Sequence, residues 1–178
     1  EAVNSTKGKI VAYNGQPINA FFHANSGGIT ESSLNIWGGI DYPYLKSVET
    51  SGEEGYTQYA SEVTLTQQEL LEKLKVKYED CAIDFTAQDC IKILDHTTSG
   101  RIKTIKFGNK EIAGTEARTL LGLKSTNFEV AIDGENIIFS VTGYGHGVGM
   151  SQTGADSLAK QGLKYEEIIT SVIRINFP

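Results

Sequence analysis

Residues 143–152 concentrate the groups in this chain whose types and spacing suit chemistry. They read Gly-Tyr-Gly-His-Gly-Val-Gly-Met-Ser-Gln, so glycine alternates with larger side chains over seven residues. In an extended strand this alternation would leave one face as bare backbone, carried by Gly143, Gly145, Gly147 and Gly149. Such glycines indicate close approach of a ligand or another backbone segment, or torsions that only glycine tolerates. His146, the titratable group of the segment, is a candidate catalytic residue.

A helix is expected from about residue 155, capped by Ser151 or Thr153. The free N–H groups of its first turn suit a polar ligand. Candidates for substrate contact in this segment are Tyr144, Gly147, Gly149, Ser151 and Gln152. The alternative is a tight strand-to-helix turn in which His146 only packs. The glycine spacing matches neither the dinucleotide nor the phosphate-loop fingerprint.

A second polar stretch, residues 22–31, reads Phe-His-Ala-Asn-Ser-Gly-Gly-Ile-Thr-Glu and is followed by Trp37, Tyr42 and Tyr44. A sugar site needs fixed partners for hydroxyl groups and aromatic rings for the pyranose faces. The residues of this stretch that suit such contacts are His23, Ser26, Gly27, Gly28 and Thr30. The alternative is a loop of ordinary turn residues, with Trp37 in the core.

Glu31 ends this stretch and is a candidate general acid, provided that burial raises its pKa towards neutrality. The alternative is a carboxylate that stabilises the start of a helix. His23 and His146 either line one cleft or serve as structural histidines. A Ser-His-Asp triad is disfavoured because neither Ser26 nor Ser151 lies in a Gly-x-Ser-x-Gly elbow.

Composition restricts the class of protein. The 178 residues are 39% hydrophobic and 21% charged, which is typical of one globular domain over 1–178. The net charge of -6 argues against nucleic acid as a partner. Cys81 and Cys90 either form a disulfide, which suits an exported protein, or remain buried thiols. They are too few for a zinc site, and no metal or cofactor is expected.

The sequence also predicts which elements position these residues. Three turns flanked by apolar runs predict hairpins: residues 9–13 with 18–23, 101–107 with 111–113, and 128–132 with 136–142. Helices are expected at 69–78 (capped by Thr66), 87–94, 115–121, 155–161 and 165–173. Antiparallel hairpins with short packing helices favour an α+β fold.

Taken in order, these stretches resemble the stage II sporulation protein D family, which includes amidase-enhancer proteins of the bacterial cell wall. The resemblance covers nearly the whole chain, and only the ordered set is specific. The matching pieces are Ala2-Val3, Thr6-Lys7-Gly8, Ser26-Gly27-Gly28, Thr30-Glu31, Ser99-Gly100-Arg101 and Arg118, together with residues 43–48, 125–128 and 146–155.

The resemblance implies a lytic transglycosylase acting on peptidoglycan glycan strands stripped of stem peptides. In that reaction one carboxylic acid protonates the leaving oxygen between N-acetylmuramic acid and N-acetylglucosamine. The muramic C6 hydroxyl then attacks C1, giving a 1,6-anhydro end without water or an enzyme nucleophile. The implied partners are a peptidoglycan amidase and membrane proteins of the engulfment complex. The implied location is extracytoplasmic at the sporulation septum or forespore membrane, with an anchor in a preceding segment.

One departure from the family concerns the acid itself. The family's acid is a glutamate in a Glu-Met-Pro segment upstream of the region that matches Ala2-Val3, and this chain contains no Glu-Met-Pro. We therefore expect a shortened chain that lacks the acid, or a member in which another residue, best Glu31, replaces it. A zinc site of some relatives lies in the same upstream region and is not inherited by Cys81 and Cys90. The rival hypothesis is a noncatalytic cell-wall binding module or amidase activator.

Overall fold

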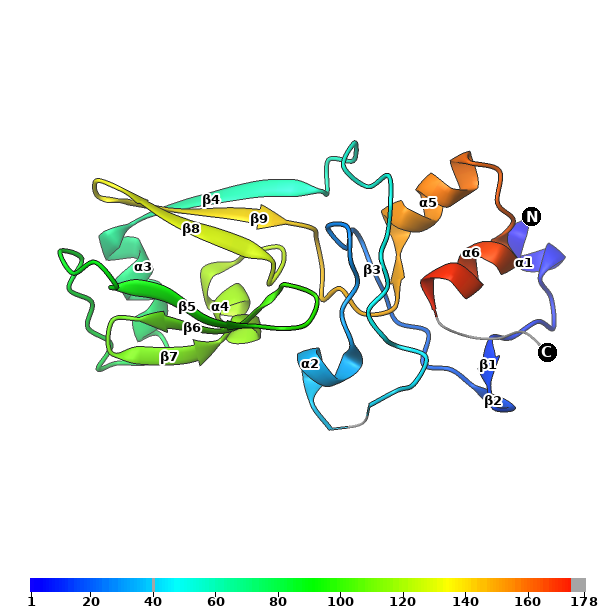
Figure 1. Cartoon of the computed structure of the whole chain (residues 1–178), viewed down its shortest axis with the longest axis horizontal. Helices are drawn as coiled ribbons and strands as arrows, with labels where there is room; N and C mark the ends of the chain where they lie inside the picture. Colours follow the sequence, from blue (N-terminus) through cyan, green and yellow to red (C-terminus); the bar gives the residue numbers. More distant parts are fainter. Residues whose placement is uncertain (40, 174–178) are drawn as a thin grey trace.

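The computed structural model describes residues 1–39 and 41–173, which form an elongated molecule (Figure 1). Two small sheets and the helices α3 and α4 make up one end. Helices α1, α5 and α6 lie at the other end. The two polar stretches of the sequence cross between these ends.

The first sheet has the order β4-β9-β8, with antiparallel neighbours. Its strands are β4 (Ala60–Thr66), β8 (Phe128–Asp133) and β9 (Asn136–Thr142). The β8–β9 hairpin closes between Asp133 and Asn136 on Gly134, whose φ is 59°. This hairpin confirms the one predicted around residues 133 and 134. Alternate side chains of β9 are buried, which points one face of the sheet into the core.

The second sheet has the order β5-β6-β7, also antiparallel. It contains β5 (Ile91–His96), β6 (Ile102–Phe107) and β7 (Lys110–Ala113), and the predicted turn at residues 108 and 109 is confirmed. The helix predicted over 87–94 is wrong. Residues 87–90 form turns, and β5 begins at Ile91. Ile91 and Ile93 are half-buried and alternate with exposed neighbours, a two-residue period that suits pairing with β6.

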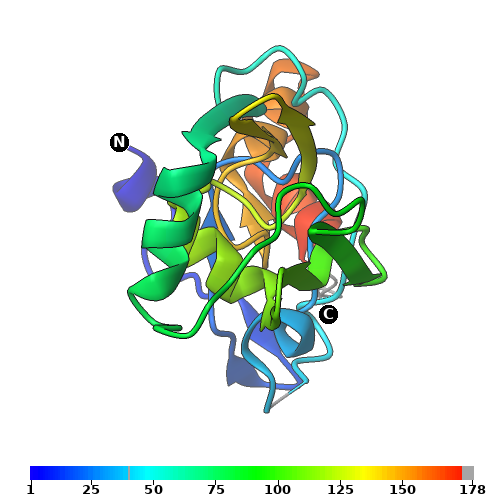
Figure 2. The ribbon, with the colours of Figure 1, turned by 90° about the vertical axis from the view of Figure 1, so that its left-hand side faces the viewer.

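Helices α3 (Gln67–Lys75) and α4 (Gly114–Leu121) complete the core of this end. Figure 2 shows both helices at the front when the molecule is viewed from the sheet end. Thr66 and Glu69 form a capping box that starts α3, as predicted. Leu70 and Leu74 of α3 are fully buried, and they pack with side chains of both sheets and of α4 in one hydrophobic cluster.

The other end holds short elements around a second, smaller hydrophobic cluster. They are α1 (Ala2–Ser5), β1 (Ala12–Tyr13), β2 (Gln16–Pro17), β3 (Phe22–His23), α2 (Ser33–Trp37), β10 (Met150–Ser151), α5 (Gln152–Lys160) and α6 (Tyr165–Val172). The hairpin predicted over 9–23 exists only as the β1–β2 pairs. Strand β3 instead pairs in parallel with β10. The architecture is a single α+β domain, as predicted.

Two further expectations concern cysteines and membrane helices. Cys81 and Cys90 are buried and are not bonded to each other, so the alternative of two buried thiols holds. Within residues 1–39 and 41–173, no helix combines the length and the apolar character that crossing a membrane requires.

Candidate functional site

The two polar stretches lie side by side. Strand pairing joins Met150 to Phe22 and Ser151 to His23, and isolated bridges join Asn25 to Tyr144 and Glu31 to Val148. The backbone hydrogen bonds between them include Glu31 N–H to Gly147 O at 2.8 Å and Tyr144 N–H to Asn25 O at 2.8 Å. The structure thus builds one site from residues 22–31 and 143–153.

The glycines of residues 143–149 do not form the bare strand face that the sequence suggested. All four have positive φ, from 74° to 117°, so the chain turns repeatedly through the left-handed region. A Cβ atom on Gly147 would lie 2.6 Å from the Arg101 guanidinium, and one on Gly149 would lie 2.2 Å from the Phe21 carbonyl oxygen. Gly147 and Gly149 are therefore approached by protein atoms, which corrects their expected role as open backbone for a substrate.

Glu53, which the sequence analysis missed, is a carboxylate that connects the two stretches through hydrogen bonds. Its side chain is fully buried and accepts hydrogen bonds from both of them. The donors are the Ser26 and Ser151 hydroxyls, the Thr50 and Thr153 hydroxyls at 2.7 and 2.9 Å, and the Ser26 and Gly28 N–H groups, each at 3.1 Å. Burial alone would raise the pKa of Glu53, but these donors, Ser151 foremost, lower it to about 2.

Glu31 is the second buried carboxylate, and its environment favours the charged form. It accepts hydrogen bonds from the Ser99 and Thr97 hydroxyls, each at 2.5 Å. The Asn35 side chain and the Ser32 N–H donate at 2.8 and 2.7 Å. Burial acts to raise the pKa of Glu31, but these donors outweigh it and hold the pKa below its usual value. A general acid must carry a proton, whereas these donors favour the charged form of Glu31, which lies beside the start of α2.

Arg101 places a positive charge between these two carboxylates. Its side chain is buried and donates to the Ser26 carbonyl at 2.6 Å and to the Ser125 hydroxyl at 2.7 Å. Burial lowers its pKa to about 10, while the charges of Glu31 and Glu53 act in the opposite direction. Arg101 thus connects the end of the molecule that holds the sheets to the turn at Ser26.

His23 and His146 lie together, with ring centroids 5.8 Å apart. His23 is buried, and its Nδ1 lies 3.1 Å from the Val148 carbonyl, which accepts from it. Burial lowers the pKa of His23 to about 4. His146 is half-buried, its Nδ1 accepts from the Val148 N–H at 3.0 Å, and burial followed by the charge of Arg118 lowers its pKa. Burial thus favours the neutral form of both rings.

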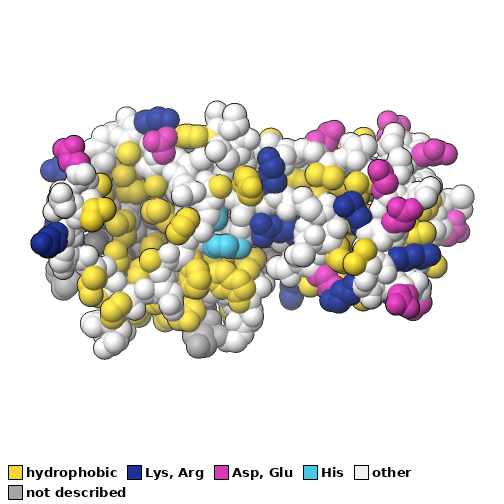
Figure 3. Space-filling view, turned by 180° about the vertical axis from the view of Figure 1, so that it is seen from behind, with side chains coloured by type: hydrophobic (Ala, Val, Ile, Leu, Met, Phe, Trp, Pro, Cys, Tyr) yellow, Lys and Arg dark blue, Asp and Glu magenta, His cyan; other side chains and the backbone are white. Residues whose placement is uncertain are grey.

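The solvent-facing part of the site is aromatic and basic. Trp37 is 48% exposed, with its ring 5.2 Å from that of His146, and Tyr144 is 43% exposed, with Lys124 Nζ 5.2 Å from its ring centroid. We call Trp37, His146, Tyr144, Arg118 and Lys124 the aromatic–basic surface. Figure 3 shows histidine atoms near the middle of one face, bordered by hydrophobic and by Lys or Arg side chains. Trp37 lies at this surface and not in the core.

The other residues predicted to contact a substrate fall into two groups, one fully buried and one accessible to solvent. Ser26, Thr30 and Ser151 are fully buried and bonded within the protein, so they support the site and do not face solvent. Gln152 is exposed at the start of α5, which Ser151 caps through the Gly154 N–H. Gly27 and Gly28 are half-buried, and Gly28 borders a hollow of about 500 Å³ beside Thr50.

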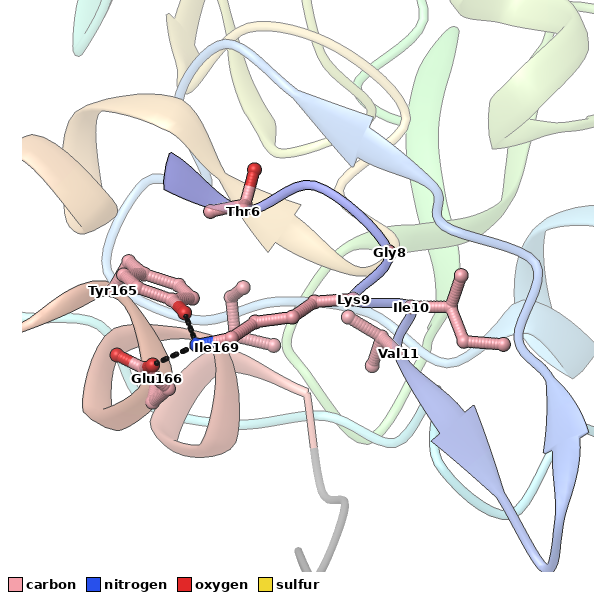
Figure 4. Close-up of a pocket in the computed structure, with 8 residues that line it drawn as sticks. All are labelled: Thr6, Gly8, Lys9, Ile10, Val11, Tyr165, Glu166 and Ile169. Atoms are coloured by element: carbon pink, nitrogen blue, oxygen red, sulfur yellow. Dashed lines mark hydrogen bonds and ion pairs between the residues drawn. The ribbon is translucent and has the colours of Figure 1, made fainter. Parts of the chain in front are cut away.

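A cavity of about 690 Å³ lies elsewhere, between the first residues of the chain and α6 (Figure 4). Lys9 crosses it and donates to the Tyr165 hydroxyl at 2.5 Å and to Glu166 at 3.3 Å. None of its lining residues belongs to the two polar stretches. Among the residues the structure describes, no three His, Cys, Asp or Glu side chains are grouped as metal ligands.

Comparison with known proteins identifies relatives for nearly the whole chain, although no family model matches it. It is 37% identical over 169 residues to stage II sporulation protein D of Bacillus subtilis (strain 168), covering 95% of this chain and 47% of that protein. The Bacillus amyloliquefaciens protein of the same name is 35% identical, over 94% of this chain and 47% of its own length. The amidase enhancer of Bacillus subtilis is 26% identical over 95% of this chain and 31% of its own length.

The chain thus spans about half the length of the two sporulation proteins that it matches. The alignments include both polar stretches, whose meeting in space builds the site. Over the 95% of its length that aligns, the comparisons support the resemblance of this chain to the stage II sporulation protein D family.

Proposed function

We propose that this chain is the glycan-binding part of a lytic transglycosylase that acts on peptidoglycan during sporulation. Its resemblance to this family supports a sporulation-related role at the cell wall. The observation that carries the proposal is the aromatic–basic surface at the crossing of the two polar stretches. Sugar rings stack on exposed aromatic side chains, and neutral imidazole and cationic groups bind hydroxyl and carboxylate oxygens.

The charged form of the two buried carboxylates indicates which part of the reaction this chain would perform. Glu31 and Glu53 are both held in the charged form by several donors, so neither is prepared to give a proton to a leaving oxygen. We therefore propose that the acid lies in a segment equivalent to the part of the relatives that this chain does not cover. This chain would bind and orient the glycan so that O6 of the muramic ring meets C1, which is a task of positioning.

Mass spectrometry of products tests this proposal. Peptide-free glycan strands are incubated with this chain and with a protein extended to the length of its relatives. We expect 1,6-anhydro ends only from the longer protein, and glycan binding from both. Anhydro products from this chain alone would place the acid within these residues, and Glu31→Gln would then test the remaining predicted candidate.

The second candidate is a noncatalytic wall-binding module or amidase activator, which the name of the amidase enhancer favours. Glycan binding without anhydro products from either protein would support it. In both cases the proposed partners are glycan strands, a peptidoglycan amidase and membrane proteins of the engulfment complex. The proposed location is the extracytoplasmic cell envelope at the sporulation septum. Cross-linking in sporulating cells, with the longer protein as bait, tests these partners.

A further inference from the structure

Two cations of the aromatic–basic surface form no ion pair with any carboxylate among residues 1–39 and 41–173. The chain carries 22 acidic against 16 basic residues, so carboxylates are in excess. Seven lysines of the described residues form ion pairs, but Arg118 and Lys124 are in none of them. Arg118 uses only Nε within the described part of the chain, donating to the Leu123 carbonyl at 3.3 Å. Its two terminal nitrogens therefore remain available.

The fold holds these cations beside the exposed rings. The Lys124 carbonyl accepts the Gly145 N–H at 2.9 Å, which fixes the loop after α4 against the glycine-rich turn. Lys124 Nζ then lies over the Tyr144 ring, and the charge of Arg118 helps to lower the pKa of His146. Arg118 is half-buried, so its guanidinium is partly desolvated and interacts more strongly with an anion than a freely hydrated cation does.

The chemistry of the glycan supplies an anion only when it is free of peptide. Each muramic residue carries a lactyl ether. Its carboxyl group is an amide where a stem peptide is attached and a carboxylate where the peptide has been removed. The planar guanidinium fork of arginine matches the two oxygens of a carboxylate, and an amide offers neither the charge nor the second acceptor oxygen.

We infer that Arg118 and Lys124 bind the lactyl carboxylate of a peptide-free muramic residue whose sugar ring lies against Tyr144. This inference rests on the proposed glycan-binding function and gives it a specificity determinant. A stem peptide would remove the charge and add bulk at the same point. The two cations therefore select stripped strands over peptide-bearing ones.

Fluorescence titration of the single tryptophan, Trp37, tests the inference, because its ring lies beside His146 in the same surface. The two ligands are tetrasaccharides of alternating N-acetylglucosamine and N-acetylmuramic acid. One has free lactyl carboxylates, and in the other these groups are converted to methylamides. We expect the carboxylate ligand to bind about tenfold more tightly.

The variants are Arg118→Gln and Lys124→Gln, with Lys75→Gln of α3 as a control that makes the same charge change at the far end of the molecule. We expect the first two to lose most of the preference for the carboxylate and to keep their affinity for the methylamide. Lys75→Gln should retain the preference. Arg118→Lys should recover part of it, and thermal melts establish folding. Lys124 is exposed, so its variant tests the inference even if Arg118→Gln fails to fold.

Equal affinity of the unmodified chain for both ligands would overturn carboxylate recognition and leave the proposed glycan binding intact. A preference that survives in Arg118→Gln and Lys124→Gln would likewise overturn the assignment to these residues. Absence of binding to both ligands would overturn this inference together with the proposed function.

Discussion

At the scale of single residues, the site depends on charged groups that the protein solvates with its own donors. Glu53 and Glu31 each accept several hydrogen bonds, and Arg101 supplies the opposing charge. A buried carboxylate without such partners would become protonated, since burial penalises the charged form. These groups therefore maintain the positions of the two stretches, and the groups that face solvent are different ones.

The low pKa of Glu53 predicts a specific loss of stability in acid. The carboxyl has a pKa of about 2 in the folded protein, against an ordinary value of 4.5 in the unfolded chain. Its contribution is thus fully present above pH 4.5 and is lost as the pH falls towards 2. The expected size is about 3 kcal/mol in the free energy of unfolding.

Urea unfolding at pH 6, 4 and 3 measures this effect. Glu53→Gln should lower the stability at pH 6 and show a shallower dependence on pH than the unmodified chain. Glu129→Gln, an exposed carboxylate change on β8, should keep the original dependence. Identical pH slopes for Glu53→Gln and the unmodified chain would contradict the role assigned to Glu53.

His146→Ala is expected to weaken glycan binding about tenfold while the domain stays folded. The ring is half-buried against Trp37, and its hydrogen bond from the Val148 N–H supports a local turn, so the melting temperature should fall by less than about 5 °C. Isotherms with peptide-free glycan and thermal melts measure the two effects. His96→Ala, at an exposed position of β5, is the matched control. A collapsed melting temperature would assign His146 a structural role instead.

At the scale of elements, local turn chemistry was predictable and long-range pairing was not. The turn residues at 108–109 and 134 correctly predicted two hairpins, because the backbone torsions of such turns favour glycine and asparagine. The error at 87–94 arose because short apolar runs suit either a helix or a strand, and pairing with β6 decided for β5. Glu53 lies in a Ser-Gly-Glu-Glu-Gly turn, where no local signal separates it from the exposed Glu54.

Alanine substitutions at two glycines should differ in their cost in folding free energy. Gly147 lies in the turn between β9 and β10, and Gly122 ends α4. Gly147 and Gly122 both have positive φ, 81° and 73°, so alanine at either position should cost about 1–2 kcal/mol of folding free energy. Only at Gly147 would the new Cβ meet the Arg101 guanidinium, whereas none of the neighbouring heavy atoms lies within 4 Å at Gly122. Gly147→Ala should therefore cost a further 1–3 kcal/mol or so. Denaturant unfolding of both variants measures the difference, and equal losses would show that Arg101 yields without cost.

At the scale of the whole molecule, two hydrophobic clusters are separated by a buried polar network, which includes Glu31, Glu53 and Arg101. The larger cluster is built from the sheets with α3 and α4, and the smaller one surrounds Val148. The polar stretches cross where these two cores meet. The aromatic–basic surface is therefore sensitive to how the two ends of the molecule are joined.

Arg101→Met, which keeps the volume and removes the charge, should separate the behaviour of the two ends. Ser26 and Ser125 would lose a hydrogen-bond donor and the two buried carboxylates would lose a compensating charge, so the loss of stability should be about 3–5 kcal/mol. Hydrogen exchange followed by mass spectrometry should show faster exchange in residues 22–31 and 143–151 than in β9. A uniform increase over all segments would indicate that Arg101 supports the global core instead.

The parallel pairing of β3 with β10 also determines when the protein acquires its surface. Residues 22 and 23 find their partners only at residues 150 and 151, so most of the polypeptide must be made before the contact exists. At typical rates of synthesis that interval is roughly 10 s, and closing so large a loop is among the slower steps of folding. A nascent chain therefore cannot complete the pairing that supports the aromatic–basic surface until residues 150 and 151 have been made.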